Sequence, residues 1–114
     1  MTVPLITTKV STEITKEKEI SLKSEFGKAI ELIGKSENWL MVEFQDNCRL
    51  YFKGDDAPCA MIEVDLFGKA SDSGYDALTQ KITEIVEAEL GIPKDRIYVK
   101  YSEIGHWGYS GFNF

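Results

Sequence analysis

The sequence predicts an α+β fold in which two β-α-β units form a four-stranded mixed sheet with two helices on one face. Three observations support this. The chain has 114 residues, the size of one ordinary domain. Two segments carry apolar residues at helical spacing, and β-branched or apolar segments flank each of them. Parallel strands joined through a helix need a right-handed crossover, which places the helices on a common face. Residues 1–114 are therefore expected to form a single domain.

The first half of the chain is expected to hold one helix between two strands. Residues 3–10 are apolar and β-branched, and Pro4 near their start suits the beginning of a strand. From about residue 16 to 33, apolar side chains recur at helical spacing, and Gly34 is suited to the helix C-terminal cap. Residues 38–45 predict the second strand.

The second half repeats this order after a short insertion. Residues 49–53 are predicted as a short strand before a turn, and residues 58–66 as a third long strand. Residues 71–74 contain serines that favour a helix start, and Gly91 favours its end. Residues 97–101 predict the final strand.

Composition excludes several classes of function. The chain has 13 Lys and Arg against 19 Asp and Glu, a net charge of −6, so a nucleic-acid partner is not expected. No apolar run approaches the length of a membrane span, and the N-terminal residues lack a signal-peptide pattern, so a cytoplasmic location without membrane contact is expected. Cys48, Cys59 and the single His106 do not form a metal motif, so neither a metal nor a cofactor is predicted.

One face of such a sheet has no helices, and the sequence predicts that apolar residues lie on it. The expected residues are Leu40, Val42, Phe44, Met61 and Val64. Residues 105–114 add a tail with four aromatic side chains, which is costly to expose. Oligomerisation, with the tail docked on a neighbour, is the simplest way to cover both surfaces.

Four motifs resemble one known family. Residues 34–35, 65–69, 93–98 and 107–109 look like the landmarks of the macrophage migration inhibitory factor family, within the tautomerase superfamily. The resemblance implies a homotrimer with three active sites at subunit boundaries. It also implies keto–enol tautomerisation of a small aromatic α-keto acid such as phenylpyruvate, with an N-terminal proline as the base. The alternative for the same element order is a ferredoxin-like regulatory domain.

The N-terminus departs from this family pattern. A free α-amine near neutral pH can take a proton from carbon, whereas a proline inside the chain is a tertiary amide with no basic lone pair. In one register Pro4 occupies the family position behind a three-residue extension. In the other, Thr2 occupies it, and removal of Met1 would free a primary amine. Proteolysis that exposes Pro4 is a third possibility.

The resemblance assigns further pocket residues one by one. Lys35 resembles the lysine that holds the substrate carboxylate and lowers the pKa of the base, although a solvated lysine after a helix is the alternative. Phe67 takes the place of an isoleucine whose backbone lines the pocket. Tyr98 resembles a hydrogen-bond donor supplied by the neighbouring subunit, and Lys100 a nearby polar residue. Either of these last two could instead be an ordinary strand residue.

Three aromatic residues complete the expected pocket. Trp107 and Tyr109 resemble the wall that grips a phenyl ring, and Phe114 the C-terminal residue beside it, with packing between subunits as the competing explanation. Two hypotheses remain. One is a tautomerase whose activity is absent or strongly reduced because no N-terminal proline is exposed, and the other is a non-catalytic trimer that keeps an anion-binding pocket.

Overall fold

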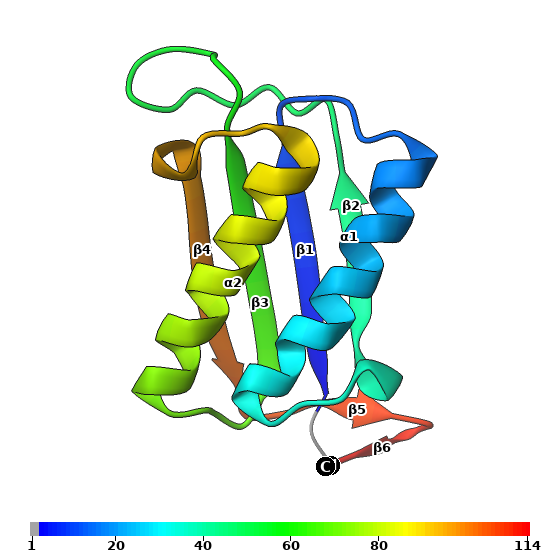
Figure 1. Ribbon diagram of the computed structural model, residues 1–114. Coiled ribbons are helices and arrows are strands. Elements are labelled where there is room, and N and C mark those ends of the chain that lie inside the picture. Colours follow the sequence, from blue (N-terminus) through cyan, green and yellow to red (C-terminus); the bar gives the residue numbers. More distant parts are fainter. Residues whose placement is uncertain (1–2) are drawn as a thin grey trace.

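The strand order and directions match the predicted pair of β-α-β units. A computed structural model describes residues 3–114. Strands β1 (Pro4–Val10), β2 (Met41–Gln45), β3 (Ala60–Phe67) and β4 (Ile97–Ile104) form a sheet in the order β2-β1-β3-β4 (Figure 1). The β1–β2 and β3–β4 pairs are parallel, and β1 and β3 run antiparallel between them. The prediction of a mixed four-stranded sheet is confirmed.

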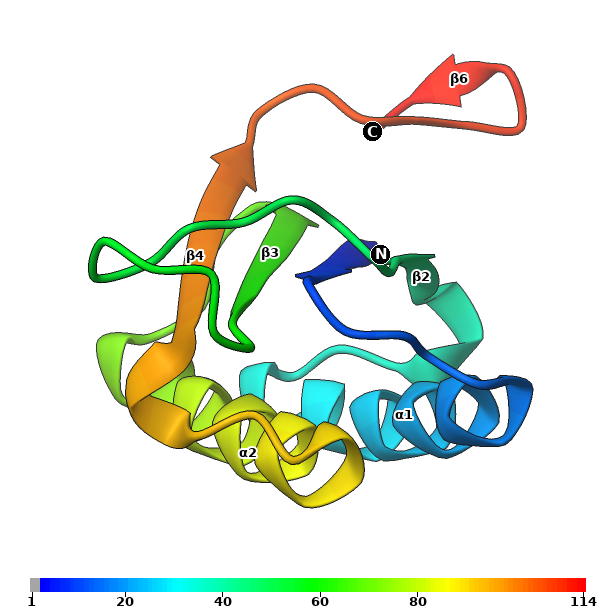
Figure 2. The same ribbon diagram turned by 90° about the horizontal axis from the view of Figure 1, so that it is seen from above.

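Both helices pack on the same face of this sheet, as Figure 2 shows. Helix α1 spans Lys16–Ala29 and continues as a 3₁₀ turn, η1 (Ile30–Ile33), while α2 spans Asp72–Leu90. Thr15 and Ser71 cap the two N-termini by accepting backbone N–H bonds. The predicted helix over residues 16–33 is therefore α-helical except in its last turn. Of the helices in the described part of the chain, neither is long and apolar enough to cross a membrane.

The hydrophobic core lies between the helices and the sheet. It includes Phe26 of α1 and Ile82 of α2, both fully buried, together with alternate residues of β1 and β3. Along β3 the even-numbered residues are buried and the odd-numbered ones are partly exposed. This alternation is the two-residue period of a strand with one face on a core.

The alternation corrects the expectation for the helix-free face. Val64 is fully buried in the core, and Leu40, Val42 and Phe44 pack against the core from β2 and the residue before it. Of the predicted set, only Met61 has the parity of the helix-free face. Residues 61 and 64 are three apart and cannot share one face of a strand, which is why the prediction was wrong.

The prediction of a short strand before the turn was wrong. Residues 49–53 form no strand, and Phe52 makes only an isolated bridge to Asp55. Two short 3₁₀ turns, η2 (Glu37–Trp39) and η3 (Lys94–Arg96), come directly before β2 and β4. The C-terminal tail is a small hairpin of β5 (Gly108–Tyr109) and β6 (Phe112–Asn113), and its aromatic rings contact other residues of the same chain, while docking of the tail on a neighbour stays a prediction.

Candidate functional site

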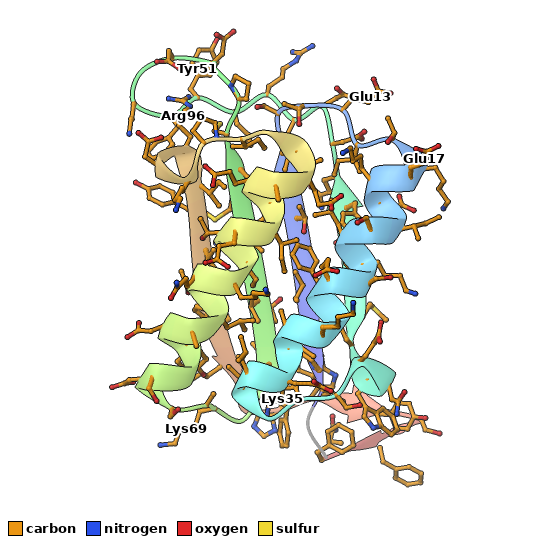
Figure 3. All side chains as sticks on the ribbon, in the orientation of Figure 1. Glu13, Glu17, Lys35, Tyr51, Lys69 and Arg96 are labelled. Atoms are coloured by element: carbon orange, nitrogen blue, oxygen red, sulfur yellow. The ribbon has the colours of Figure 1, made fainter. Side chains whose placement is uncertain are left out.

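One end of the sheet gathers most of the predicted site residues. Strands β1 and β2 are parallel and begin at this end, and β3 ends there because it is antiparallel to β1. Helix α1 returns the chain to the same end, which places Lys35 below the start of β1 (Figure 3). The hairpin β5–β6 lies there too (Figure 1). Segments that are distant in sequence therefore meet at one end of the sheet.

A groove of about 630 Å³ opens at this end of the molecule. Its walls come from the first residues of β1, from the segment 38–42 and from residues 107–109. Pro4, Trp107 and Tyr109, all predicted from sequence, line it together. The lining is mainly apolar and aromatic, which suits an apolar ring better than a sugar or a nucleotide.

Pro4 is built into the sheet. It is buried, pairs with Leu66 of β3, and is preceded by Val3, which is 5% exposed. The backbone N–H of Phe67 donates to the Val3 carbonyl at 3.1 Å, so the antiparallel contact continues beyond Pro4. The Pro4 nitrogen is acylated by Val3 and has no basic lone pair. Thr2, the other predicted base, lies outside the described residues.

Lys35 is a buried cation. It is 6% exposed, and burial lowers the pKa of its ammonium group. Its backbone N–H donates to Ile30, and Gly34 before it takes the left-handed conformation that ends η1. Among residues 3–114, no carboxylate forms an ion pair with Lys35, and Lys35 is absent from the described lining of the groove. A bound anion at this end of the sheet would supply the missing negative charge.

Aromatic rings form a continuous wall beside the groove. Tyr109 meets Trp39 edge to face with 5.1 Å between ring centroids, and it stacks near Phe114 at 6.4 Å. Phe114 in turn lies 5.4 Å from the ring of Phe67. The predicted residues Phe67, Tyr109 and Phe114 therefore belong to one cluster. The Phe114 backbone N–H also donates to the Trp107 carbonyl at 3.0 Å, which ties the end of the chain to the start of the hairpin.

Trp39 is a site residue that the sequence reasoning missed. It was placed inside the second strand, whereas it ends η2, lines the groove and is 38% exposed. A signal for it was available. Residues just before two parallel strands lie at the same end of a sheet, so Trp39 was bound to lie close to the start of β1.

Tyr98 and Lys100 lie away from this groove. Tyr98 pairs with Met61 near the start of β3, six residues before Phe67, which corresponds to roughly 20 Å along the strand. Tyr98 as a residue is 56% exposed, and its ring centroid lies 4.7 Å from that of Phe52. Lys100 pairs with Glu63 at 3.3 Å on the helix-free face. Neither residue can reach the groove of its own chain.

Among residues 3–114, no cluster of three His, Cys, Asp or Glu side chains could hold a metal ion. The groove has an apolar aromatic wall, and the buried Lys35 lies at the same end of the sheet, outside the described lining of the groove. Aromatic walls favour apolar rings and a buried ammonium group favours carboxylates, so this end of the sheet offers contacts of both kinds.

The comparisons with known proteins agree with this fold. The sequence model of the family described as "Macrophage migration inhibitory factor (MIF)" matches residues 3–113. The crystal structure of Leishmania major MIF2 is 33% identical, with a TM-score of 0.94 over 98% of this chain and 97% of that one. A homologue from Prochlorococcus marinus is 28% identical, with a TM-score of 0.88 over 96% and 98% of the two chains.

A curated relative gives a shorter match. The macrophage migration inhibitory factor homolog of Brugia malayi is 25% identical over 72 residues, and the match covers 63% of this chain and 63% of the length of that relative.

Proposed function

Because the chain belongs to the macrophage migration inhibitory factor family, as its motifs predicted, we propose that it is a homotrimer that binds a small aromatic α-keto acid and has lost most or all keto–enol tautomerase activity. The bound molecule is phenylpyruvate-like. Each pocket lies at a boundary between two subunits, and no metal or cofactor takes part.

The observation that carries the loss of activity is the position of Pro4. Its nitrogen is bonded to Val3, and both residues are buried and fixed at the start of β1. Tautomerisation needs a base that removes a proton from carbon, and general-base catalysis contributes roughly 10²–10⁴ in rate. A chain in which that nitrogen is an amide therefore falls short of a proline-based tautomerase by about this factor.

Lys35 and the aromatic wall support the proposal that the protein still binds a ligand. Lys35 is buried without a carboxylate partner among residues 3–114, which is costly unless an anion completes it. The wall of Trp39, Tyr109 and Phe114 provides an apolar aromatic surface for a ring. Lys35 then orients the carboxylate and does not act as the base.

The proposal of a trimer is supported by the exposure of Tyr98, which lies near the start of β4, at the end of the sheet opposite the groove. In a closed ring of three chains, the same surface of each subunit meets a different surface of the next. A ring in which Tyr98 approaches the neighbour's groove brings the predicted pocket residues together, and within one chain they stay apart. Tyr98 and Lys100 are then the neighbour's contribution to each pocket.

The experiment compares three forms of the chain, beginning at Met1, Thr2 or Pro4, with each N-terminus checked by intact mass. Phenylpyruvate enol–keto exchange is followed by ultraviolet absorbance, and binding of phenyllactate, which cannot tautomerise, by quenching of tryptophan fluorescence. We expect the Met1 form to bind phenyllactate with exchange close to the buffer rate. Exchange well above buffer in the Met1 form would disprove the loss of activity.

The shortened forms separate the two registers. Activity gained only in the Thr2 form would mean that the Thr2 amine is the latent base, and activity gained only in the Pro4 form would assign that role to Pro4. Activity in neither form, together with phenyllactate binding, would support a purely binding protein. Absence of phenyllactate binding in all forms would overturn the proposed ligand class.

A further inference from the structure

Arg96 is a buried cation that the pocket described above does not use. It is the last residue of η3 and is 8% exposed, and its guanidinium group donates hydrogen bonds to backbone carbonyls. Its Nε donates to Pro58 at 3.0 Å, and its Nη2 donates to Phe52 at 3.1 Å, Ala57 at 2.9 Å and Asp55 at 3.4 Å. These four acceptors all belong to one loop, residues 52–58.

The contacts indicate a clamp on this loop rather than an ordinary ion pair. The one carboxylate beside Arg96 is that of Asp55, at 2.9 Å, and its side chain is 58% exposed. An exposed carboxylate does little to offset the burial of a guanidinium. Several backbone carbonyls from one short segment offset the cost of burying the guanidinium more effectively, because this planar group donates hydrogen bonds in several fixed directions. The loop has no strand pairing of its own beyond the Phe52–Asp55 bridge.

The contacts of Arg96 with the loop also fix the position of the Phe52 side chain. The guanidinium carbon of Arg96 lies 5.5 Å from the ring centroid of Phe52, within range of a cation–π contact. The ring of Phe52 contacts the ring of Tyr98 at 4.7 Å and a tilt of 45°. Tyr98 is 56% exposed, so Phe52 is its principal aromatic neighbour on this surface. Arg96 is thus linked to Tyr98 through Phe52 (Figure 3 shows Arg96 beside this loop).

We propose that Arg96 is a positioning residue, which fixes the loop 52–58 and the Phe52 ring so that Tyr98 is held ready for the pocket of a neighbouring copy. The inference rests on the proposed function, in which Tyr98 completes that pocket. Arg96 itself touches no ligand. Its effect reaches the ligand by restricting the Tyr98 ring, and pre-organised groups bind more tightly than groups that must be ordered on binding.

The test is a double-mutant cycle on phenyllactate binding by the full-length chain. Phe52→Leu removes the ring between Arg96 and Tyr98 and leaves the buried arginine intact. Arg96→Lys removes the guanidinium fork, and urea unfolding with measurement of the assembly mass shows whether that variant still folds. Each is combined with Tyr98→Ala. The matched control is Lys53→Met, since Lys53 also lies over the Phe52 ring, at 5.6 Å, but makes no contact with the four carbonyls.

We expect Phe52→Leu and Arg96→Lys each to weaken phenyllactate binding about fivefold, because each loosens the aromatic contact that holds the Tyr98 ring. In the Tyr98→Ala background neither should weaken it further, and Lys53→Met should leave binding within about twofold of wild type. Equal weakening with and without Tyr98, or no weakening by Phe52→Leu, would overturn the positioning role. Failure of the wild-type chain to bind phenyllactate would instead reject the proposed function and, with it, this inference.

Discussion

At the scale of single residues, Lys35 shows a conflict between stability and binding. Burial disfavours the charged ammonium, so its pKa in the folded protein lies below the value of about 10.5 expected in the unfolded chain. Below the folded pKa, the charged lysine destabilises the native state. That cost decreases as pH rises from the folded pKa towards the unfolded one, above which both states are neutral.

Lys35→Met is therefore expected to stabilise the free protein while it abolishes ligand binding. We expect a gain on the order of 1 kcal/mol at pH 7, typical of replacing a functional buried charge. The gain should shrink as the pH approaches about 10.5. Urea unfolding at pH 7 and at alkaline pH measures it, and phenyllactate should protect the wild type only. A loss of stability at pH 7 would mean that Lys35 has a structural partner.

Thr8 poses a related problem without a role in binding. It is fully buried on the helix side of β1, and no hydrogen-bond partner for its Oγ1 is found within residues 3–114. An unpaired buried hydroxyl is costly, and valine has nearly the same shape. Thr8→Val should raise the free energy of unfolding by about 1 kcal/mol, measured by urea unfolding. Thr7→Val on the opposite face serves as the control, and an equal gain there would contradict this explanation.

At the scale of elements, α2 shows what could be predicted from sequence. Its serine start and its end at Gly91 were both predicted, because each depends on a local backbone requirement. Gly91 has φ +69° in the left-handed region. Gly91→Ala should cost about 1 kcal/mol in urea unfolding. Gly105→Ala should cost much less, because φ is not positive there and an added Cβ would meet no atom within 4 Å beyond the adjacent residues. Equal costs would mean that the left-handed conformation is not the reason.

The segment 49–53 shows what could not be predicted. Its apolar and aromatic residues fit a strand locally, but the segment pairs with no strand of the sheet, and the Arg96 side chain binds its backbone and that of the following residues. Sequence patterns carry no record of such distant contacts. The buried state of Lys35 was hidden for the same reason, since it depends on how β1 and β2 are brought together, whereas the place of Trp39 could have been inferred from the parallel direction of these two strands.

The contact between α2 and β4 adds a prediction on pH. Tyr101 bonds to Thr79 with 2.7 Å between the two hydroxyl oxygens, and its ring lies 4.6 Å from that of Tyr75. Burial is the main cause that raises the pKa of both phenols, so the folded state favours their neutral forms. Below about pH 10 both states are neutral and stability is unaffected. Above it the unfolded chain ionises first, so stability falls with rising pH.

Tyr101→Phe removes one of the two phenol groups that cause this loss of stability at alkaline pH. It should cost about 1 kcal/mol at pH 7, because Thr79 loses a hydrogen-bond partner. It should also reduce the loss of stability between about pH 10 and 11. Urea unfolding over this range measures both effects. An unchanged alkaline slope would indicate that Tyr101 already ionises normally in the folded protein.

At the scale of the whole molecule, the helix-free face has a different character from the one predicted. Glu63 lies between Lys9 at 2.9 Å and Lys100 at 3.3 Å, and the hydrogen bond from Lys9 is the main cause that lowers the pKa of this carboxyl group. A face with such charges does not need an apolar cover. The case for assembly therefore rests on the separated halves of the pocket, with Tyr98 and the groove at opposite ends of the sheet.

A mixing experiment tests this separation directly. In the proposed trimer each pocket takes Lys35 from one chain and Tyr98 from the next, so trimers of Lys35→Met or of Tyr98→Ala alone contain no complete pocket. When the two variants are unfolded together and reassembled in equal amounts, chance pairing restores both residues in about a quarter of the pockets. Phenyllactate titration should then show that fraction of tight sites, in particles of about three times the 12.9 kDa chain mass.

The same experiment distinguishes assembly from binding within one chain. If Lys35 and Tyr98 served one pocket of the same subunit, each variant chain would lack one of them and no mixture could restore a tight site. If Tyr98 played no part in binding, its variant alone would bind as well as the wild type before any mixing. Recovery on mixing requires that the two residues meet across a subunit boundary, because only there can different chains supply them.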